Sequence, residues 1–450
     1  MHLLPGVADE WHLPVQVQPG NKALPVSPDK WTLPVLPDKW IVPDYGPQSL
    51  AAVLPAAVGA LGLDLAFPAG SSRQCAQGLG VAWASAQHVV VVVCDGLGMA
   101  NLQARSGYTP FLRRQLASSR KITTSFPSTT AAALASFGTG HGPGMTGMLG
   151  YTLRRPSDGA LVNLVSWTQQ SDPRRASDPQ AGKTAPAWDV DPVAFQPQAT
   201  VFERLAAHQL AVTSVGKSRF AGSGMTQASL RGARFVGADS LVDAVDATIA
   251  SALATSGARA GAAGLTYLYW GELDHVAHEQ GWTSPAWSDA LEDFDRELSR
   301  LAHSLPSNCL LMVTADHGHV EVDPAQQVDV AQQPQLAQGV QLLAGEPRVG
   351  HVYLLPGHSA QEVAHRWSHY LEGTAVVATR QQAVDAGWFG PVSPQAMDWI
   401  GDLVVACDGQ ASIVDSRTMS PHAVALKGQH GSMTAQEMQV PLIVLAGLAA

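Results

Sequence analysis

The chain has 450 residues, of which 46% are hydrophobic and 14% charged, so it can bury one large core or two moderate ones. Its net charge is −10 and no block of Lys or Arg stands out, so we expect no nucleic-acid polymer as a partner. The four cysteines are isolated in the sequence, which fits a reducing compartment and not a disulfide framework. Neither a signal-peptide pattern nor an apolar run of bilayer length is present, so we expect a cytoplasmic protein without a membrane partner.

The N-terminal region consists largely of a proline- and tryptophan-rich repeat. Residues 23–31 and 32–40 are near-perfect copies of one nine-residue unit that ends in Pro-Asp-Lys-Trp. Prolines at this density disfavour helices and most sheet structure, and leave extended or polyproline II conformations. We therefore expect residues 1–45 to form a flexible arm without chemistry.

The first element with possible chemistry is the run His88–Cys94, whose five consecutive valines are typical of a strand buried on both faces. It ends at Asp95-Gly96. Open α/β sheets bind ligands at the C-terminal ends of central strands, so Asp95 is a candidate ligand. Asp-Gly is also a common turn pair, so Asp95 alone does not establish a site.

Three hydroxyl residues, Ser128, Thr129 and Thr130, precede an alanine-rich run that predicts a helix ending near Gly138. The N-terminal end of a helix suits a phosphate or another anion, because its backbone N–H groups and its dipole favour negative charge. An ordinary helix cap explains the same residues. Composition does not choose among the three hydroxyls.

Helices and strands alternate in the rest of the chain, which is typical of a doubly wound α/β domain with a mostly parallel central sheet and helices on both faces. We predict helices at 199–210, 240–255 and 284–305, and strands at 211–215, 265–269, 309–314 and 440–445. Residues 326–425 contain shorter strand-like pieces around a helix predicted at 360–371, and we interpret them as an inserted subdomain. The catalytic domain would then comprise 46–325 and 426–450.

Further potential ligands follow the predicted strands. Asp274 and His278 lie four residues apart and would share one face of a helix, although a surface ion pair gives the same spacing. Asp316 and His317 come directly after the strand 309–314, where such a pair indicates a metal site more than a turn. His430 lies beside Gly431 and alone would be an ordinary loop histidine. Seven possible ligands, about the number that two divalent metals need, can thus reach one rim: Asp95, Thr130, Asp274, His278, Asp316, His317 and His430.

This set resembles the alkaline phosphatase superfamily, and within it the nucleotide pyrophosphatase/phosphodiesterase branch, over about residues 88–445. The motifs that carry the resemblance are Asp95-Gly96, Pro127-x-x-Thr130 with Thr139-Gly140, Asp274-x-x-x-His278, Asp316-His317-Gly318 and His430-Gly431. By its spacing to Thr139, the resemblance implies that Thr130 is the nucleophile. It also implies two divalent ions, expected to be zinc: one bound by Asp274, His278 and His430, the other by Asp95, Asp316, His317 and the Thr130 oxygen.

The activity implied by this resemblance is hydrolysis of phosphodiester or pyrophosphate bonds in small nucleotide-like molecules, through a phospho-threonine intermediate. Ala131–Ala133 replace the Phe-Pro-Asn of well-known family members, which leaves diester versus monoester preference open. The alternatives are a phosphomonoesterase, a phosphonate hydrolase or mutase of the same superfamily, or a non-catalytic metal-binding module. A sulfatase is disfavoured, because the Cys/Ser-x-Pro-x-Arg motif is absent near Thr130. His275 and His319 have no assigned role, and the oligomeric state stays open.

Overall fold

The computed structural model describes residues 35–170, 187–256 and 263–447, and the structural statements below concern these residues. Most of the predicted N-terminal arm, residues 1–34, lies outside them. Among the described helices, none is both long enough and apolar enough to cross a membrane.

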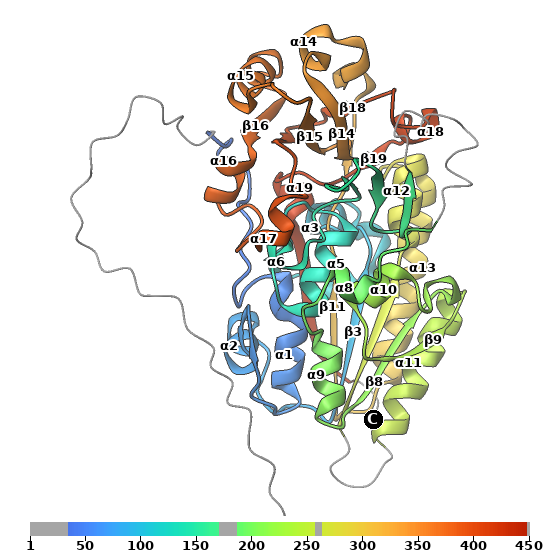
Figure 1. Cartoon of the computed structure of the whole chain (residues 1–450). Coiled ribbons are helices and arrows are strands. Elements are labelled where there is room, and N and C mark those ends of the chain that lie inside the picture. The colour runs from blue at the N-terminus through green and yellow to red at the C-terminus, as the bar shows by residue number, and fades with distance from the viewer. Residues whose placement is uncertain (1–34, 171–186, 257–262, 448–450) are drawn as a thin grey trace, which may run out of the picture. The chain divides into compact units, whose positions relative to one another are not determined.

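A central sheet runs through the described chain (Figure 1). It has seven strands in the order β4-β20-β11-β3-β10-β8-β9. Its strands are β4 (Arg120–Thr123), β20 (Gln439–Ala446), β11 (Cys309–Thr314), β3 (His88–Cys94), β10 (Gly264–Trp270), β8 (Ala211–Gly216) and β9 (Arg234–Gly237). The five strands from β11 to β9 run parallel, whereas β20 is antiparallel to both of its neighbours, β11 and β4. β4 therefore runs in the same direction as the parallel strands.

Helices cover both faces of this sheet. One layer contains α1 (Val53–Ala60), α2 (Ser72–Leu79), α5 (Thr130–Thr139), α9 (Val201–Ala207) and α10 (Gly224–Ser229). The other contains α4 (Pro110–Gln115), α11 (Leu241–Ser256), α12 (Glu272–Gln280) and α13 (Pro285–Ser304). Both α1 and α11 contact β3, and Figure 1 shows the sheet between the two layers. The predicted doubly wound, mostly parallel α/β architecture is confirmed.

The central strand β3 explains why this sheet forms the core. All seven of its side chains are buried, as its valine run predicts, because β-branched residues pack well on the two covered faces of a parallel sheet. The one polar side chain, His88, is bonded through Nε2 to Thr266 Oγ1 of β10 at 2.9 Å. The strand ends are thereby fixed in a rigid layer.

A second, smaller sheet lies within residues 326–425, the range that we propose as an inserted subdomain. Its order is β14-β15-β17-β16, with all neighbours antiparallel. The strands are β14 (Val340–Glu346), β15 (Val349–Leu354), β17 (Leu403–Cys407) and β16 (Ala375–Thr379), and α15 (Ala360–Tyr370) packs on β16. The sheet has an apolar cluster of its own, with Trp367 at 0% exposure.

Short elements complete the described structure. The remaining strands are β5 (Thr152–Arg154), β6 (Leu161–Asn163) and β7 (Thr168–Gln170) in one sheet, and the pairs β1 (Ala66–Phe67) with β2 (Gly70–Ser71), β12 (Val320–Glu321) with β19 (Gly428–Gln429), and β13 (Gln327–Asp329) with β18 (Ser412–Val414). The short α-helices include α3 (Met99–Ala104), α6 (Pro143–Thr146), α8 (Pro192–Phe195), α14 (Pro334–Ala337), α16 (Arg380–Asp385), α17 (Pro394–Met397), α18 (Pro421–Val424) and α19 (Ala435–Met438).

Packing begins earlier in the chain than the sequence suggests. We expect the flexible arm to extend to residue 45, yet Trp40 is only 6% exposed and its Nε1 donates to Asp408 Oδ1 at 2.9 Å. The next residue, Ile41, donates its backbone N–H to the carbonyl oxygen of Met433 at 2.9 Å. The physical reason is the large apolar surface of the Trp40 indole, whose burial stabilises the folded state.

Candidate active site

One edge of the central sheet collects the predicted ligands, because the C-terminal ends of β3, β4, β10 and β11 all lie there. The N-terminal end of β20 reaches the same edge, since that strand runs in the opposite direction. Asp95 follows β3, Thr130 begins α5 after β4, Asp274 and His278 lie on α12 after β10, Asp316 and His317 follow β11, and His430 precedes β20. All seven predicted side chains therefore project from the same edge.

The first group of donors surrounds His317. The Nε2 atom of His317 lies 3.3 Å from Asp95 Oδ1, 3.7 Å from Asp316 Oδ2 and 3.3 Å from Thr130 Oγ1. Asp95 Oδ1 and Asp316 Oδ2 are buried and have no hydrogen-bond partner among the described residues. Their companion oxygens are satisfied: the Tyr269 hydroxyl donates to Asp95 Oδ2, and two backbone N–H groups donate to Asp316 Oδ1. Unpartnered buried carboxylate oxygens beside an imidazole nitrogen suit a cation.

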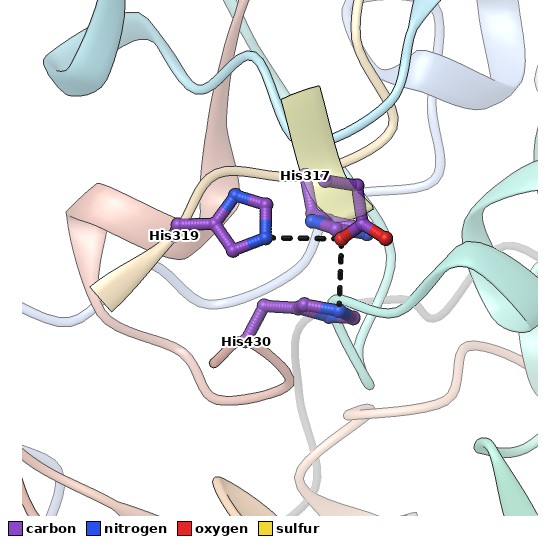
Figure 2. Close-up of side chains that lie close together, drawn as sticks. His317, His319 and His430 are labelled. Carbon is purple, nitrogen blue, oxygen red and sulfur yellow. Dashed lines mark hydrogen bonds and ion pairs between the residues drawn. The ribbon is translucent and has the colours of Figure 1, made fainter. Parts of the chain in front are cut away.

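The second group surrounds one oxygen of Asp274. Asp274 Oδ1 lies 3.3 Å from His278 Nε2, 3.6 Å from His430 Nε2 and 3.0 Å from His319 Nε2. Figure 2 shows His319 and His430 directed at a single carboxylate oxygen, with His317 beside them. His319 is not among the seven predicted ligands. Its only signal in the sequence is its place two residues after His317.

The two groups lie next to each other. The donor atoms of Asp274, His317, His319 and His430 are within 4.8 Å of one another, as are those of Asp95, Asp316 and His317. The rings of His317 and His430 stack with their centroids 3.6 Å apart. Donors around a tetrahedral zinc ion at 2.0–2.1 Å are separated by about 3.3 Å, so the observed separations fit such an ion in each group.

The electrostatics of the site also favour cations. Burial and the Asp95 carboxylate raise the pKa of Asp316 well above its usual value. Burial would lower the pKa of His317, but Asp316 and Asp95 raise it to about 10. Burial would raise the pKa of Asp274, but His278 holds it well below its usual value. The raised pKa of Asp316 reflects its burial and the repulsion between the Asp95 and Asp316 carboxylates, and a divalent cation bound between them would offset that repulsion.

The three adjacent hydroxyls have different neighbours. Ser128 Oγ donates to the carbonyl oxygen of Ser432 at 2.7 Å and accepts from the backbone N–H of Gly431 at 3.1 Å. Thr129 occupies the N-cap position of α5 without a capping bond, and its side chain is hydrogen-bonded to Glu346 instead. Thr130 Oγ1 is directed at His317.

Comparison with known proteins places this geometry in context. The family model described as type I phosphodiesterase / nucleotide pyrophosphatase matches residues 89–433. No curated protein matches the chain. A structure of inactive murine ectonucleotide pyrophosphatase/phosphodiesterase 5 in complex with AMP is 16% identical, with a TM-score of 0.59, and the match covers 79% of this chain and 87% of that one.

Two further solved structures show the same fold. Human ectonucleotide pyrophosphatase/phosphodiesterase 5 is 14% identical with a TM-score of 0.58, and the match covers 79% of this chain and 87% of that one. Phosphonoacetate hydrolase from Sinorhizobium meliloti, in complex with phosphonoformate, is 20% identical with a TM-score of 0.57, covering 80% and 90%. At these identities the structures show a shared fold, and the match that decides the family is the one over residues 89–433. The chain belongs to the type I phosphodiesterase/nucleotide pyrophosphatase family and is a phosphoryl hydrolase of the alkaline phosphatase superfamily.

Proposed function

We propose that the chain hydrolyses phosphodiester or pyrophosphate bonds of small nucleotide-like molecules, with Thr130 as the nucleophile. The observation that carries this proposal is the position of Thr130 Oγ1, 3.3 Å from His317 Nε2 and next to the unpartnered oxygens of Asp95 and Asp316. Ser128 and Thr129 use their hydroxyls elsewhere.

Two divalent ions would be held at this edge of the sheet. Asp95, Asp316, His317 and the Thr130 oxygen would hold one, and Asp274, His278 and His430 the other. Mixed nitrogen and oxygen donors at these separations suit zinc. When bound, the ions favour ionisation of the threonine hydroxyl and offset the charge of the transferring phosphoryl group.

The chain's own residues then carry out two displacements. Thr130 Oγ1 attacks phosphorus, and the bond from phosphorus to the leaving oxygen breaks. The product is a phospho-threonine whose phosphorus still carries the substrate's second ester group, and the leaving oxygen departs with the proton of the threonine hydroxyl. Water next cleaves the bond between phosphorus and Oγ1 and restores the hydroxyl. Because Thr129 does not cap α5, the N–H groups of its first turn are available for phosphoryl oxygens.

The groups around Thr129, which precedes Thr130 in the chain, favour a singly charged phosphate group. Thr129 and the backbone N–H of Tyr151 are both bonded to Glu346, and the Tyr151 side chain is bonded to Asn163. Burial raises the pKa of Glu346 to about 8, so in the chain without bound metal its carboxyl group is largely neutral near pH 7. These contacts supply no positive charge for a monoester, which carries about −1.5 to −2 at pH 7, or for a carboxylated phosphonate.

A comparison of substrates tests this preference. We expect bis-p-nitrophenyl phosphate to be hydrolysed faster than p-nitrophenyl phosphate, and phosphonoacetate to release no phosphate. A higher rate on phosphonoacetate would identify a phosphonate hydrolase, the activity named for one structure of the same fold.

The nucleophile is tested by trapping. Acid quenching during turnover of a diester should leave on Thr130 a phosphoryl group that still carries the retained ester group, and Thr130→Ala should reduce the rate by about 10⁴-fold or more, as loss of a nucleophile does in other enzymes. Thr130→Ser should keep part of the activity, since the oxygen remains. A phosphoryl group on Ser128 or Thr129 would contradict the assignment.

The metal content is tested separately. Protein purified without chelator should contain about two zinc ions per chain, because the seven ligands suffice for two. Full activity with one ion or none would contradict the two-metal site.

A further inference from the structure

We infer that His319 is a direct ligand of the ion on the Asp274 side, which would then be held by Asp274, His278, His319 and His430. The inference rests on the proposed function for the presence of that ion. It adds a residue outside the set implied by the family motifs.

The hydrogen bonds of His319 match those of the two histidines already proposed as ligands of this ion. In each ring, Nδ1 is hydrogen-bonded to a backbone carbonyl oxygen. The partner of His278 is the oxygen of Gly428 at 2.7 Å, that of His430 is the oxygen of Ser128 at 2.9 Å, and that of His319 is the oxygen of Gly96 at 3.0 Å. A carbonyl oxygen only accepts, so each Nδ1 carries the proton. In the neutral ring the lone pair is then on Nε2, the arrangement that metal-bound histidines usually have.

All three Nε2 atoms converge on the same carboxylate oxygen. His319 Nε2 is the nearest to Asp274 Oδ1, at 3.0 Å, compared with 3.3 Å for His278 and 3.6 Å for His430. A carboxylate oxygen has two lone pairs and cannot accept three well-aligned hydrogen bonds. One cation among the four atoms would satisfy the oxygen and the three nitrogen lone pairs together.

The surrounding structure holds His319 in place. Its side chain is 0% exposed, its backbone N–H donates to Asn101 Oδ1 at 3.1 Å, and its carbonyl oxygen accepts from Asn101 Nδ2 at 3.1 Å and Gln436 Nε2 at 2.6 Å. A Cβ atom on Gly96 would lie 2.1 Å from His319 Cε1, so this ring also explains why a glycine follows Asp95. A ligand fixed in this way loses little entropy when the metal binds.

With His319 as a ligand, the two ions would have different numbers of protein ligands. The Asp274-side ion would have four protein ligands, so it could take a substrate oxygen only as a fifth ligand. The other ion would have three, apart from the reacting hydroxyl of Thr130. We therefore expect the Asp274-side ion to be the last one removed by a chelator.

Counting imidazole ligands tests this directly. In an Asp316→Asn background, which weakens the other group, a single cobalt or zinc ion should be bound, and X-ray absorption should count three imidazoles around it. Adding His319→Gln should remove one imidazole and lower metal affinity by more than about 100-fold, beyond the 10–100-fold typical of an outer-shell partner. Glutamine keeps an N–H donor for Gly96, which protects the fold.

Two control variants frame the result. His278→Gln should also remove one imidazole, whereas the exposed His275, on the same helix α12, should be replaceable by Ala without effect. An unchanged imidazole count in the folded His319→Gln protein would overturn the inference and leave His319 as a hydrogen-bond partner of Asp274. The proposed function fails on different results, a wild-type protein without metal or without phospho-threonine.

Discussion

At the scale of single residues, hydrogen-bond partners distinguish side chains that have the same chemistry. Ser128, Thr129 and Thr130 are all able to attack phosphorus, and composition leaves the choice open. In the folded chain, the hydroxyl of Ser128 is hydrogen-bonded to the loop that carries His430, that of Thr129 to Glu346, and that of Thr130 lies beside His317. These partners come from β14, the segment after β11 and the segment before β20, so no local pattern could reveal them.

His351 provides a test of buried polarity at the same scale. Its Nε2 lies 2.9 Å from the carbonyl oxygen of Leu149 and its Nδ1 accepts from the Gly401 N–H at 3.1 Å, so the neutral ring is fully satisfied. Burial lowers its pKa from 6.5 to about 4. The folded pKa is below the unfolded one, so the stabilisation is complete above pH 6.5 and is lost as the pH falls towards 4.

The expected loss is on the order of 3 kcal/mol. Urea unfolding with a chelator present, for wild type and His351→Gln, should show a stability gap at pH 7 that narrows between pH 6.5 and 4. A gap that stays constant over this range would contradict the pKa shift.

At the scale of elements, strong local sequence patterns are sufficient to predict many of the strands and helices. The valine run of β3 and the alanine-rich run of α5 are unambiguous, and the predicted strands and helices from 199 onward match those of the structure closely. Because parallel strands end at one edge, placing a residue after a strand also placed it at the site. Five of the seven predicted ligands follow from this rule. Thr130 and His430 do not, since Thr130 begins a helix and His430 precedes an antiparallel strand.

The elements that escaped prediction are those stabilised by distant partners. β14 and the three short strands β5–β7 have no strong pattern, and β14 carries Glu346 to the site. His319 was visible in the sequence, but its role depends on Gly96 and Asp274 from two other elements. Trp40 packs beside Asp408 and the loop at Met433, which are distant from it in the sequence.

The contact between α5 and α10 gives a prediction in which two effects oppose each other. Gly138, near the end of α5, would place a Cβ atom 1.9 Å from the carbonyl oxygen of Ser229. Helix propensity alone would make Gly138→Ala stabilising by about 1 kcal/mol. We expect destabilisation instead, because the backbone of α10 cannot yield as a side chain would. A rise in the melting temperature of this variant would contradict the close contact.

At the scale of the whole described chain, the second sheet lies against the segments that carry the candidate site. Glu346 of β14 bonds Thr129, and Val349 of β15 lies where a Cβ atom on Gly431 would meet it at 2.8 Å. Between them, Arg348 forms a fully buried ion pair with Glu437 of α19. We propose that the inserted subdomain supports the metal-binding loops through these contacts.

Glu437 joins the loops on both sides of the site. Its Oε1 accepts from the Ser432 N–H at 3.0 Å and its Oε2 from the Thr434 hydroxyl at 2.5 Å, just after His430. Its backbone carbonyl oxygen accepts from the Gly318 N–H at 2.9 Å, between His317 and His319. Arg348 donates to both carboxylate oxygens, at 3.1 and 2.8 Å.

Replacing Arg348 with Met should therefore affect both stability and metal binding. The variant leaves the Glu437 carboxylate buried without a counter-charge, which costs about 3–5 kcal/mol, and the loosened His430 loop should release its metal more readily. Urea unfolding and chelator competition measure the two effects. Arg296→Met, at an exposed ion pair with Asp293, is the matched control and should change neither. Arg348→Met/Glu437→Gln removes both charges and should recover part of the loss. A double variant as unstable as the single one would show that the unpaired charge is not the cause.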